Sequence, residues 1–278
     1  MIHTPIEKVS DDIWVKREDL SCPPPGPPFA KIRGLDAFLR KNTNRVIGYT
    51  ETQISMAGWG VAFLCQQLHM KCVIFYPEYK TVEESPERLV LDFHKEKWKE
   101  FGAILYPMKA GRLRILHYMA AKILREKYGD KALMVPLYIP LSETTEEVSK
   151  EVASTVPIGK FKSIVVCVGS GVMLSGVLRG LSLIGEDIPV YGVFIRHHND
   201  VEKKRIEIIR RSNILFGGNF KLINTDYEYL QAESIKVPFP CNKFYDAKAW
   251  RWLIDHQQEI EHPILFWSIG ADGMKTGL

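Results

Sequence analysis

The chain reads Trp14-Val15-Lys16-Arg17-Glu18-Asp19-Leu20 near its start, and Phe29-Ala30-Lys31-Ile32-Arg33-Gly34-Leu35 follows shortly afterwards. The first segment has the pattern of a short strand that ends in charged residues. A stiff turn is predicted between the two, because each proline fixes φ and donates no N–H: Pro23, Pro24, Pro25, Pro27 and Pro28. Lys31 then stands at the start of a helical apolar pattern, where a desolvated amine can form a Schiff base. The alternative is a solvated lysine at a helix start.

Length and composition indicate an ordinary globular protein. The 278 residues are 46% hydrophobic and 25% charged, which suits one or two domains with a sizeable core. No apolar run is long enough to cross a bilayer and no secretory pattern opens the chain, so we expect a cytoplasmic protein with no membrane partner. The five cysteines include no CxxC pair and are expected to be reduced thiols, and the histidines lack metal-ligand spacing, so no metal site is predicted.

The net charge of +4 is mild, although positive residues cluster at 196–198, 203–205 and 210–211. Interleaved acidic residues make solvated helix faces a sufficient explanation, and a nucleic-acid or other polyanionic partner is the alternative.

Strand and helix patterns alternate along the chain. Strands are expected over 45–49, 71–77, 103–106, 132–137, 163–168, 190–195 and 263–267. Helices are expected over 55–68, 85–101, 112–128, 142–153, 173–183, 201–211 and 247–256. This alternation predicts an α/β fold with mostly parallel twisted sheets flanked by helices.

A glycine-rich turn, Gly169-Ser170-Gly171-Val172-Met173, follows the predicted strand 163–168 and opens the next helix. Glycines let an anion approach the backbone, and the first N–H groups of a helix have no internal partner. A phosphate is therefore expected here, with a tight packing turn as the alternative. A dinucleotide site is disfavoured, because the third glycine and an acidic residue near Ile195 are both missing.

Together these segments resemble the pyridoxal-phosphate (PLP) enzymes of the tryptophan-synthase-β superfamily, known as fold type II. The branch that is most similar contains aminocyclopropane-carboxylate deaminase and D-cysteine desulfhydrase. The resemblance implies PLP as cofactor, a homodimer and Lys31 as the Schiff-base lysine. It also implies a large PLP-binding domain of residues 1–35 plus 146–278 and a small substrate-closing domain of residues 36–145. Ala30 and Gly34 depart from the family pattern, which has Asn and Lys at these positions.

The resemblance assigns roles to the two ends of the cofactor. The turn formed by Gly169, Ser170, Gly171, Val172 and Met173 resembles the family's phosphate cup. Val172 and Met173 replace a Gly and a Thr, so one hydroxyl contact is lost. Ser268 is the hydroxyl implied at the pyridine nitrogen, and Ile269 or Asp272 are the alternatives.

The resemblance also implies two substrate contacts. Ser55, in the run from Thr50 to Gly60, matches the start of a small-domain helix that contacts the cofactor ring and grips the substrate carboxylate. Its alternative is a simple helix cap. Tyr245, in the run from Asn242 to Trp250, is implied as a proton donor or substrate contact, and its alternative is a core or rim tyrosine.

The implied activity is PLP-dependent, lyase-like chemistry at the α-carbon of an amino acid, such as deamination or decarboxylation. The altered loop from Ser55 to Trp59 suggests a substrate other than a small free amino acid. Some compact, virus-encoded relatives process amino acids attached to thymine bases in DNA, so an amino-acid-modified DNA base is a second candidate. The alternative from another class is a degenerate relative without catalysis that binds a small molecule or a partner.

Overall fold

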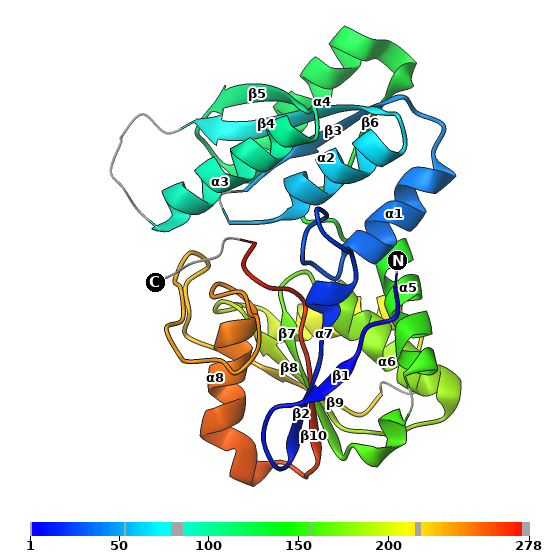
Figure 1. Ribbon diagram of the computed structural model, residues 1–278, viewed down its shortest axis with the longest axis vertical. Coiled ribbons are helices and arrows are strands. Elements are labelled where there is room, and N and C mark those ends of the chain that lie inside the picture. Colours follow the sequence, from blue (N-terminus) through cyan, green and yellow to red (C-terminus); the bar gives the residue numbers. More distant parts are fainter. Residues whose placement is uncertain (1, 53, 79–85, 156, 215–217, 274–278) are drawn as a thin grey trace. The chain divides into compact units, whose positions relative to one another are not determined.

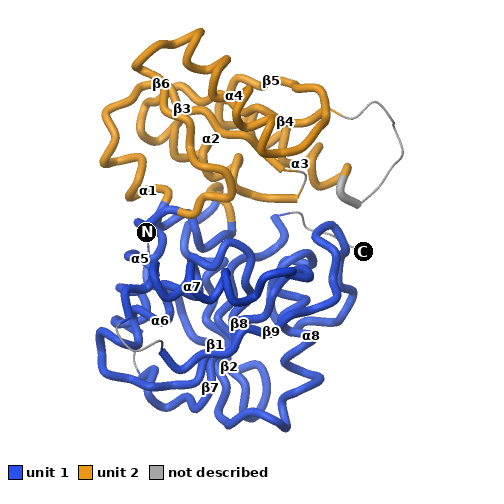
Figure 2. The backbone as a smooth tube through the Cα atoms, turned by 180° about the vertical axis from the view of Figure 1, so that it is seen from behind, with its two compact units in different colours: residues 1–24, 28–34, 141–278 blue, residues 25–27, 35–140 orange. Residues whose placement is uncertain are grey.

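The computed structural model describes residues 2–52, 54–78, 86–155, 157–214 and 218–273. The chain forms two compact units (Figure 2). Unit 1 comprises residues 1–24, 28–34 and 141–278, and unit 2 comprises residues 25–27 and 35–140. The sequence predicted changes of domain at residues 36 and 146, whereas the units change at Leu35 and Leu141.

Unit 1 is built on a six-stranded sheet with the order β1-β2-β10-β7-β8-β9 (Figure 1). In that order the strands are Ile6–Lys8, Ile13–Lys16, Ile264–Trp267, Ser163–Val168, Val190–Phe194 and Phe220–Ile223. β1 is antiparallel to β2, and all the other pairs are parallel. The carboxyl ends of β2, β10, β7 and β8 therefore meet at one edge, which is where ligands bind in such sheets.

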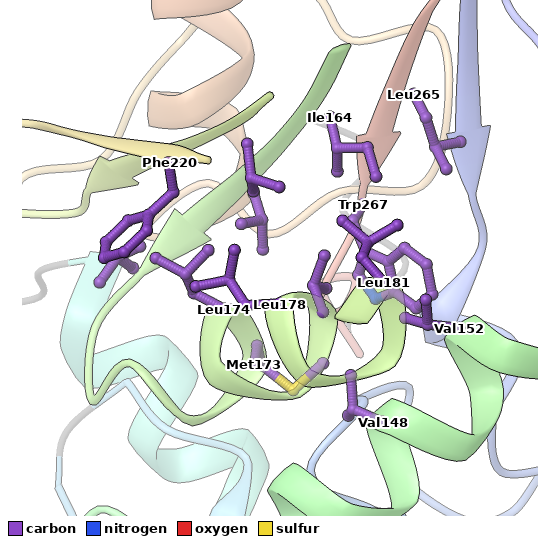
Figure 3. Close-up of a cluster of buried hydrophobic side chains, with 14 of the residues drawn as sticks. Val148, Val152, Ile164, Met173, Leu174, Leu178, Leu181, Phe220, Leu265 and Trp267 are labelled. Carbon is purple, nitrogen blue, oxygen red and sulfur yellow. The ribbon is translucent and has the colours of Figure 1, made fainter. Parts of the chain in front are cut away.

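Helices cover both faces of this sheet. They are α5 (Ser142–Ser154), α6 (Val172–Ile184), α7 (Val201–Ser212) and α8 (Asp246–His256). Figure 3 shows apolar side chains of α6, among them Leu174 and Leu178, between the strands and Val148 of α5. α6 approaches α5 closely, since a Cβ at Gly176 would lie 2.5 Å from the Val148 side chain. α8 contributes Trp250 and Leu253 to a second apolar cluster.

Unit 2 has a four-stranded parallel sheet with the order β5-β4-β3-β6. In that order the strands are Ile104–Lys109, Lys71–Glu78, Val46–Thr50 and Ala132–Met134. The helices are α2 (Ala57–Gln67), α3 (Pro86–Glu100) and α4 (Leu113–Tyr128). α1 (Ile32–Lys41) begins in unit 1 and continues into unit 2. Short 3-10 helices occupy Glu18–Leu20, Gly129–Lys131, Ile158–Lys160 and Gln257–Glu259.

The predicted α/β class with mostly parallel sheets is confirmed, and every predicted strand and helix is found with ends shifted by a few residues. β1 and β9 were not predicted. Ser85, the expected start of one helix, lies outside the described residues. All five cysteines are free, and four of them are buried. Among the described residues, no cluster of His, Cys, Asp and Glu could hold a metal ion, and no helix combines the length and apolarity needed to span a membrane.

Buried charges join four elements of unit 1: β2, the 3-10 helix Glu18–Leu20, the start of α1, and α5. Lys16, at the end of β2, is fully buried and lies 2.6 Å from Glu151 of α5. Arg33 of α1 donates to Glu18 at 2.9 Å and lies 3.4 Å from Glu151. Burial alone raises the pKa of Glu151, but hydrogen bonds from Lys16 and Thr4 outweigh it and the pKa ends below its usual range. The charges are balanced, because two cations face two anions.

Removing one member of this cluster leaves a buried charge without its partner. We expect Glu151→Gln to lower the free energy of unfolding by about 3–5 kcal/mol, measured by denaturant unfolding. Glu147→Gln is the matched control on the same helix, because it removes a surface pair with Lys150 worth about 0–1 kcal/mol. Equal effects of the two substitutions would contradict a structural role for the buried cluster.

Candidate active site

The turn that carries Lys31 is paired with the chain that follows β10. Phe29 and Gly270 form an isolated antiparallel bridge. Ala30 N donates to Ile269 O at 2.9 Å, and Ala271 N donates to Pro28 O at 3.0 Å. Two segments far apart in sequence, each at the carboxyl end of a neighbouring strand, are therefore held side by side.

Close packing explains Gly34, which departs from the family pattern. A Cβ at this position would lie 2.2 Å from Thr144 Oγ1 and 2.3 Å from Thr144 Cα. Because part of the obstruction is backbone, a side chain fits here only if α1 and α5 move apart.

The amine of Lys31 has an unusual environment. The residue lies in the turn just before α1 and is partly exposed. Burial of its amine lowers the pKa to about 8, the thiol of Cys167 acts to raise it and Arg211 acts to lower it further. Cys167 is near the end of β7, so the amine lies within electrostatic reach of the turn that follows this strand. A pKa near 8 leaves about one lysine in ten with a free amine at pH 7.

The turn from Gly169 to Met173 has the form of an anion cup. Gly171 has φ +87° and precedes α6, whose first N–H groups have no partner within the helix. The buried Oγ of Ser170 has no hydrogen-bond partner among the described residues. A Cβ at Gly171 would lie 3.0 Å from the Ile208 side chain, and other residues rarely adopt a φ of +87°, so both observations favour glycine at this position. These donors fit the phosphate of PLP, whereas the side chains of Val172 and Met173 are buried in the apolar core.

Ser268 follows β10 directly and is fully buried. The Oγ of Ser268 donates to Asp246 Oδ2 at 3.0 Å. Asp246 Oδ2 also accepts from Ile269 N at 2.8 Å and from Gly270 N at 3.0 Å. Burial raises the pKa of Asp246 to about 7 although these donors oppose it. The hydroxyl hydrogen of Ser268 thus points at Asp246, and its oxygen is left as an acceptor. Of the two alternatives to Ser268, Asp272 accepts from Asn242 Nδ2 at 2.9 Å, and Ile269 donates its backbone N–H to Asp246 Oδ2.

Tyr245 precedes α8 and is half-buried. Its hydroxyl lies 3.0 Å from the hydroxyl of Tyr229. Because Asp246 is the next residue, Tyr245 belongs to the same edge of unit 1 as Ser268.

Ser55 lies in unit 2, where it accepts from Ala57 N at 3.1 Å in the first turn of α2. Beside it, Glu51 is fully buried and accepts from Thr52 N at 2.7 Å and from Gly58 N. Burial raises the pKa of Glu51 to about 8 despite these donors. Gly58 leaves room for this carboxyl group, since a Cβ there would lie 2.4 Å from Glu51 Oε2. Ser55 thus has the contact of a helix cap, and its catalytic role stays a prediction.

The sequence did not predict a role for three residues at these sites: Glu51, Asp246 and Arg211. Arg211 of α7 donates from Nη1 to Ser170 O at 3.1 Å. From the sequence, Arg211 was expected to lie on a solvated helix face with other positive residues. For Asp246 a signal existed, because it stands next to Tyr245 within a segment that resembles the family.

A lysine before one helix and a glycine-rich anion cup before another, both beyond the carboxyl edge of one mostly parallel sheet, indicate an α/β enzyme of the PLP-binding class. The family model described as pyridoxal-phosphate dependent enzyme matches residues 2–213. The chain belongs to this family, and pyridoxal phosphate is its cofactor.

Known relatives extend this result. Over 278 residues, covering 96% of this chain and 98% of the relative, the chain is 36% identical to the glycyl-dTMP PLP-dependent decarboxylase of Pseudomonas phage M6. The crystal structure of an ACC deaminase homologue matches with a TM-score of 0.76 at 24% identity, covering 97% of this chain and 90% of that one. Serine racemase from Dictyostelium discoideum matches with a TM-score of 0.67 at 14% identity, covering 99% and 93%. These structures share the fold.

The lowered pKa of Lys31 has a measurable consequence. When apoprotein is mixed with PLP, the rate of covalent attachment rises as the amine loses its proton. We expect this rate to level off above about pH 8, because the pKa of Lys31 is lowered to about 8. For a lysine with an ordinary pKa the rate would rise until about pH 10.4. Stopped-flow absorbance measures the rate. Lys31→Ala should abolish the signal and Lys160→Ala should leave it unchanged. A rate that still climbs at pH 10 would contradict the environment described for this amine.

Proposed function

We propose that this protein is a PLP-dependent decarboxylase whose substrate is an amino acid attached to a thymine nucleotide. The observation that carries the proposal is the 36% identity, over nearly the whole of both chains, to a decarboxylase named for glycyl-dTMP. The approach of the Lys31 turn to the carboxyl edge of the unit 1 sheet supports it.

Each end of the cofactor has a candidate partner in unit 1. The amides of the turn from Gly169 to Met173 and the hydroxyl of Ser170 would hold the phosphate. Lys31 would hold the aldehyde carbon covalently. The oxygen of Ser268, oriented by Asp246, would accept a hydrogen bond from the ring nitrogen. When bound, PLP supplies an electron sink for the bonding pair released at the substrate's α-carbon.

Lys31 is suited to move the proton that completes a decarboxylation. The bond between the α-carbon and the carboxylate breaks, CO₂ leaves, and the electron pair stays with the α-carbon. A proton must then replace the lost carboxylate, and the ammonium of Lys31 would donate it. A pKa of about 8 suits this role, because a group titrating near the working pH both gives and takes protons. Tyr245 and Ser55 stay candidate substrate contacts.

Unit 2 offers an observation that favours decarboxylation over reactions that retain the substrate carboxylate. The resemblance implies that the run from Thr50 to Gly60 grips that carboxylate. Here the amides of Thr52 and Gly58 already donate to the chain's own Glu51. Those two amides are therefore engaged. A decarboxylase is better served by a carboxylate that is not held firmly, because tight binding of the group that leaves stabilises the ground state.

The experiment compares substrates and products. Purified protein with PLP would be incubated with glycyl-dTMP, with DNA carrying aminoacyl-thymidine, and with free serine, cysteine and aminocyclopropane carboxylate. We expect CO₂ release from a thymine-linked substrate, with the shortened side chain detected by mass spectrometry. Lys31→Ala should lower turnover at least about 10²-fold.

Two outcomes would contradict the proposal. Ammonia release from free amino acids without CO₂ release from either thymine-linked substrate would assign the chain to deamination. A protein that binds PLP on Lys31 but turns over none of these compounds would favour the degenerate, non-catalytic relative.

A further inference from the structure

Arg211 lies next to the glycine-rich cup, which is the turn from Gly169 to Met173. It belongs to the last turn of α7 and is half-buried. Its Nη1 donates to Ser170 O at 3.1 Å and lies 3.5 Å from the position that a Cβ would take at Gly171. A guanidinium carries five N–H donors in a planar fork, so one bond to a carbonyl leaves most of its donors for another acceptor.

The charges around the cup are predominantly positive. Arg211 acts electrostatically on Lys31, which places both cations near the same turn. Burial lowers the pKa of Arg211, but a guanidinium remains charged under all ordinary conditions. Glu207, the acidic residue one turn earlier in α7, is paired with Lys204 at 2.5 Å and also acts to raise the pKa of Arg211. A half-buried guanidinium in this position favours an anion.

The glycine-rich cup lacks a charged donor of its own. Its last two residues, Val172 and Met173, carry no hydroxyl, and both side chains are buried in the core. Within the turn the remaining donors are therefore backbone amides and Ser170 Oγ, all of them uncharged.

We propose that Arg211 is a cofactor-binding residue that donates charge-assisted hydrogen bonds to the phosphate of PLP. It supplements the hydroxyl that the residue at position 173 does not supply. The proposal rests on the proposed phosphate role of the cup and extends it to a residue of another helix. A guanidinium matches phosphate oxygens with two parallel N–H donors.

The test measures cofactor affinity and not turnover. Apoprotein would be titrated with PLP and, separately, with pyridoxal, which has the same ring and aldehyde but no phosphate. We expect Arg211→Gln to weaken PLP binding about ten- to a hundredfold and to leave pyridoxal binding unchanged. Arg211→Lys should give an intermediate loss, since it keeps the charge without the planar fork. Arg210→Gln is the matched control, because Arg210 is the neighbouring residue and is exposed.

Equal PLP affinity of Arg211→Gln and the control would overturn the proposal. An equal loss for PLP and pyridoxal would also overturn it, because it would show a structural role through Ser170. So would a wild-type protein that binds PLP no more tightly than pyridoxal. Inactivity toward thymine-linked substrates with normal, Arg211-dependent PLP binding would instead leave this inference standing and contradict only the decarboxylase assignment.

Discussion

A buried cluster of four charged side chains restricts the position of the segment that carries Lys31. Lys16, Glu18, Arg33 and Glu151 are at most 6% exposed and come from β2, the turn after it, α1 and α5. Burying four ions has a desolvation penalty that pairing only offsets, so the cluster is weak evidence of net stability. Displacing one member is much more unfavourable, because it leaves an unpaired interior charge. The cluster therefore restricts the position of Arg33, and the amine-bearing Lys31 is only two residues away from it.

Packing accounts for Gly34, which departs from the family's pattern, and for Gly58, which belongs to the altered loop from Ser55 to Trp59. Gly34 is required because α1 approaches the backbone of Thr144, and Gly58 is required because the carboxyl group of Glu51 occupies the space next to it. Another departure, the pair Val172 and Met173, has a packing role as well, since both side chains belong to the core beneath the sheet. At Gly34 and Met173, where the family pattern has Lys and Thr, this chain has close packing in place of a polar side chain.

Periodicity was enough to predict most of the fold, because strands such as β7 are fully buried and read as unbroken apolar runs. β1 and β9 escaped because they are three and four residues long and mostly exposed or half-exposed. In the candidate site, Lys31 and the turn from Gly169 to Met173 could be predicted because the residues of each motif are adjacent in sequence. Arg211 could not, since it meets Ser170 across 41 positions of sequence and resembles its solvated neighbour Arg210 in every local respect.

The carboxyl edge of the unit 1 sheet has positive charge near one segment and a buried carboxyl group near another, which is the charge pattern that the proposed orientation of the cofactor would need. Arg211 and Lys31 lie near the turn after β7, whereas the buried carboxyl of Asp246 lies against the segment after β10. PLP has a phosphate at one end and a basic ring nitrogen at the other. A positive cup would stabilise the phosphate, and the hydroxyl of Ser268, oriented by Asp246, would stabilise a protonated nitrogen. Protonation of the ring strengthens its ability to accept electrons. Burial raises the pKa of Asp246 to about 7, so the proposed contact of Ser268 with the ring nitrogen would make the ring's chemistry depend on pH near neutrality.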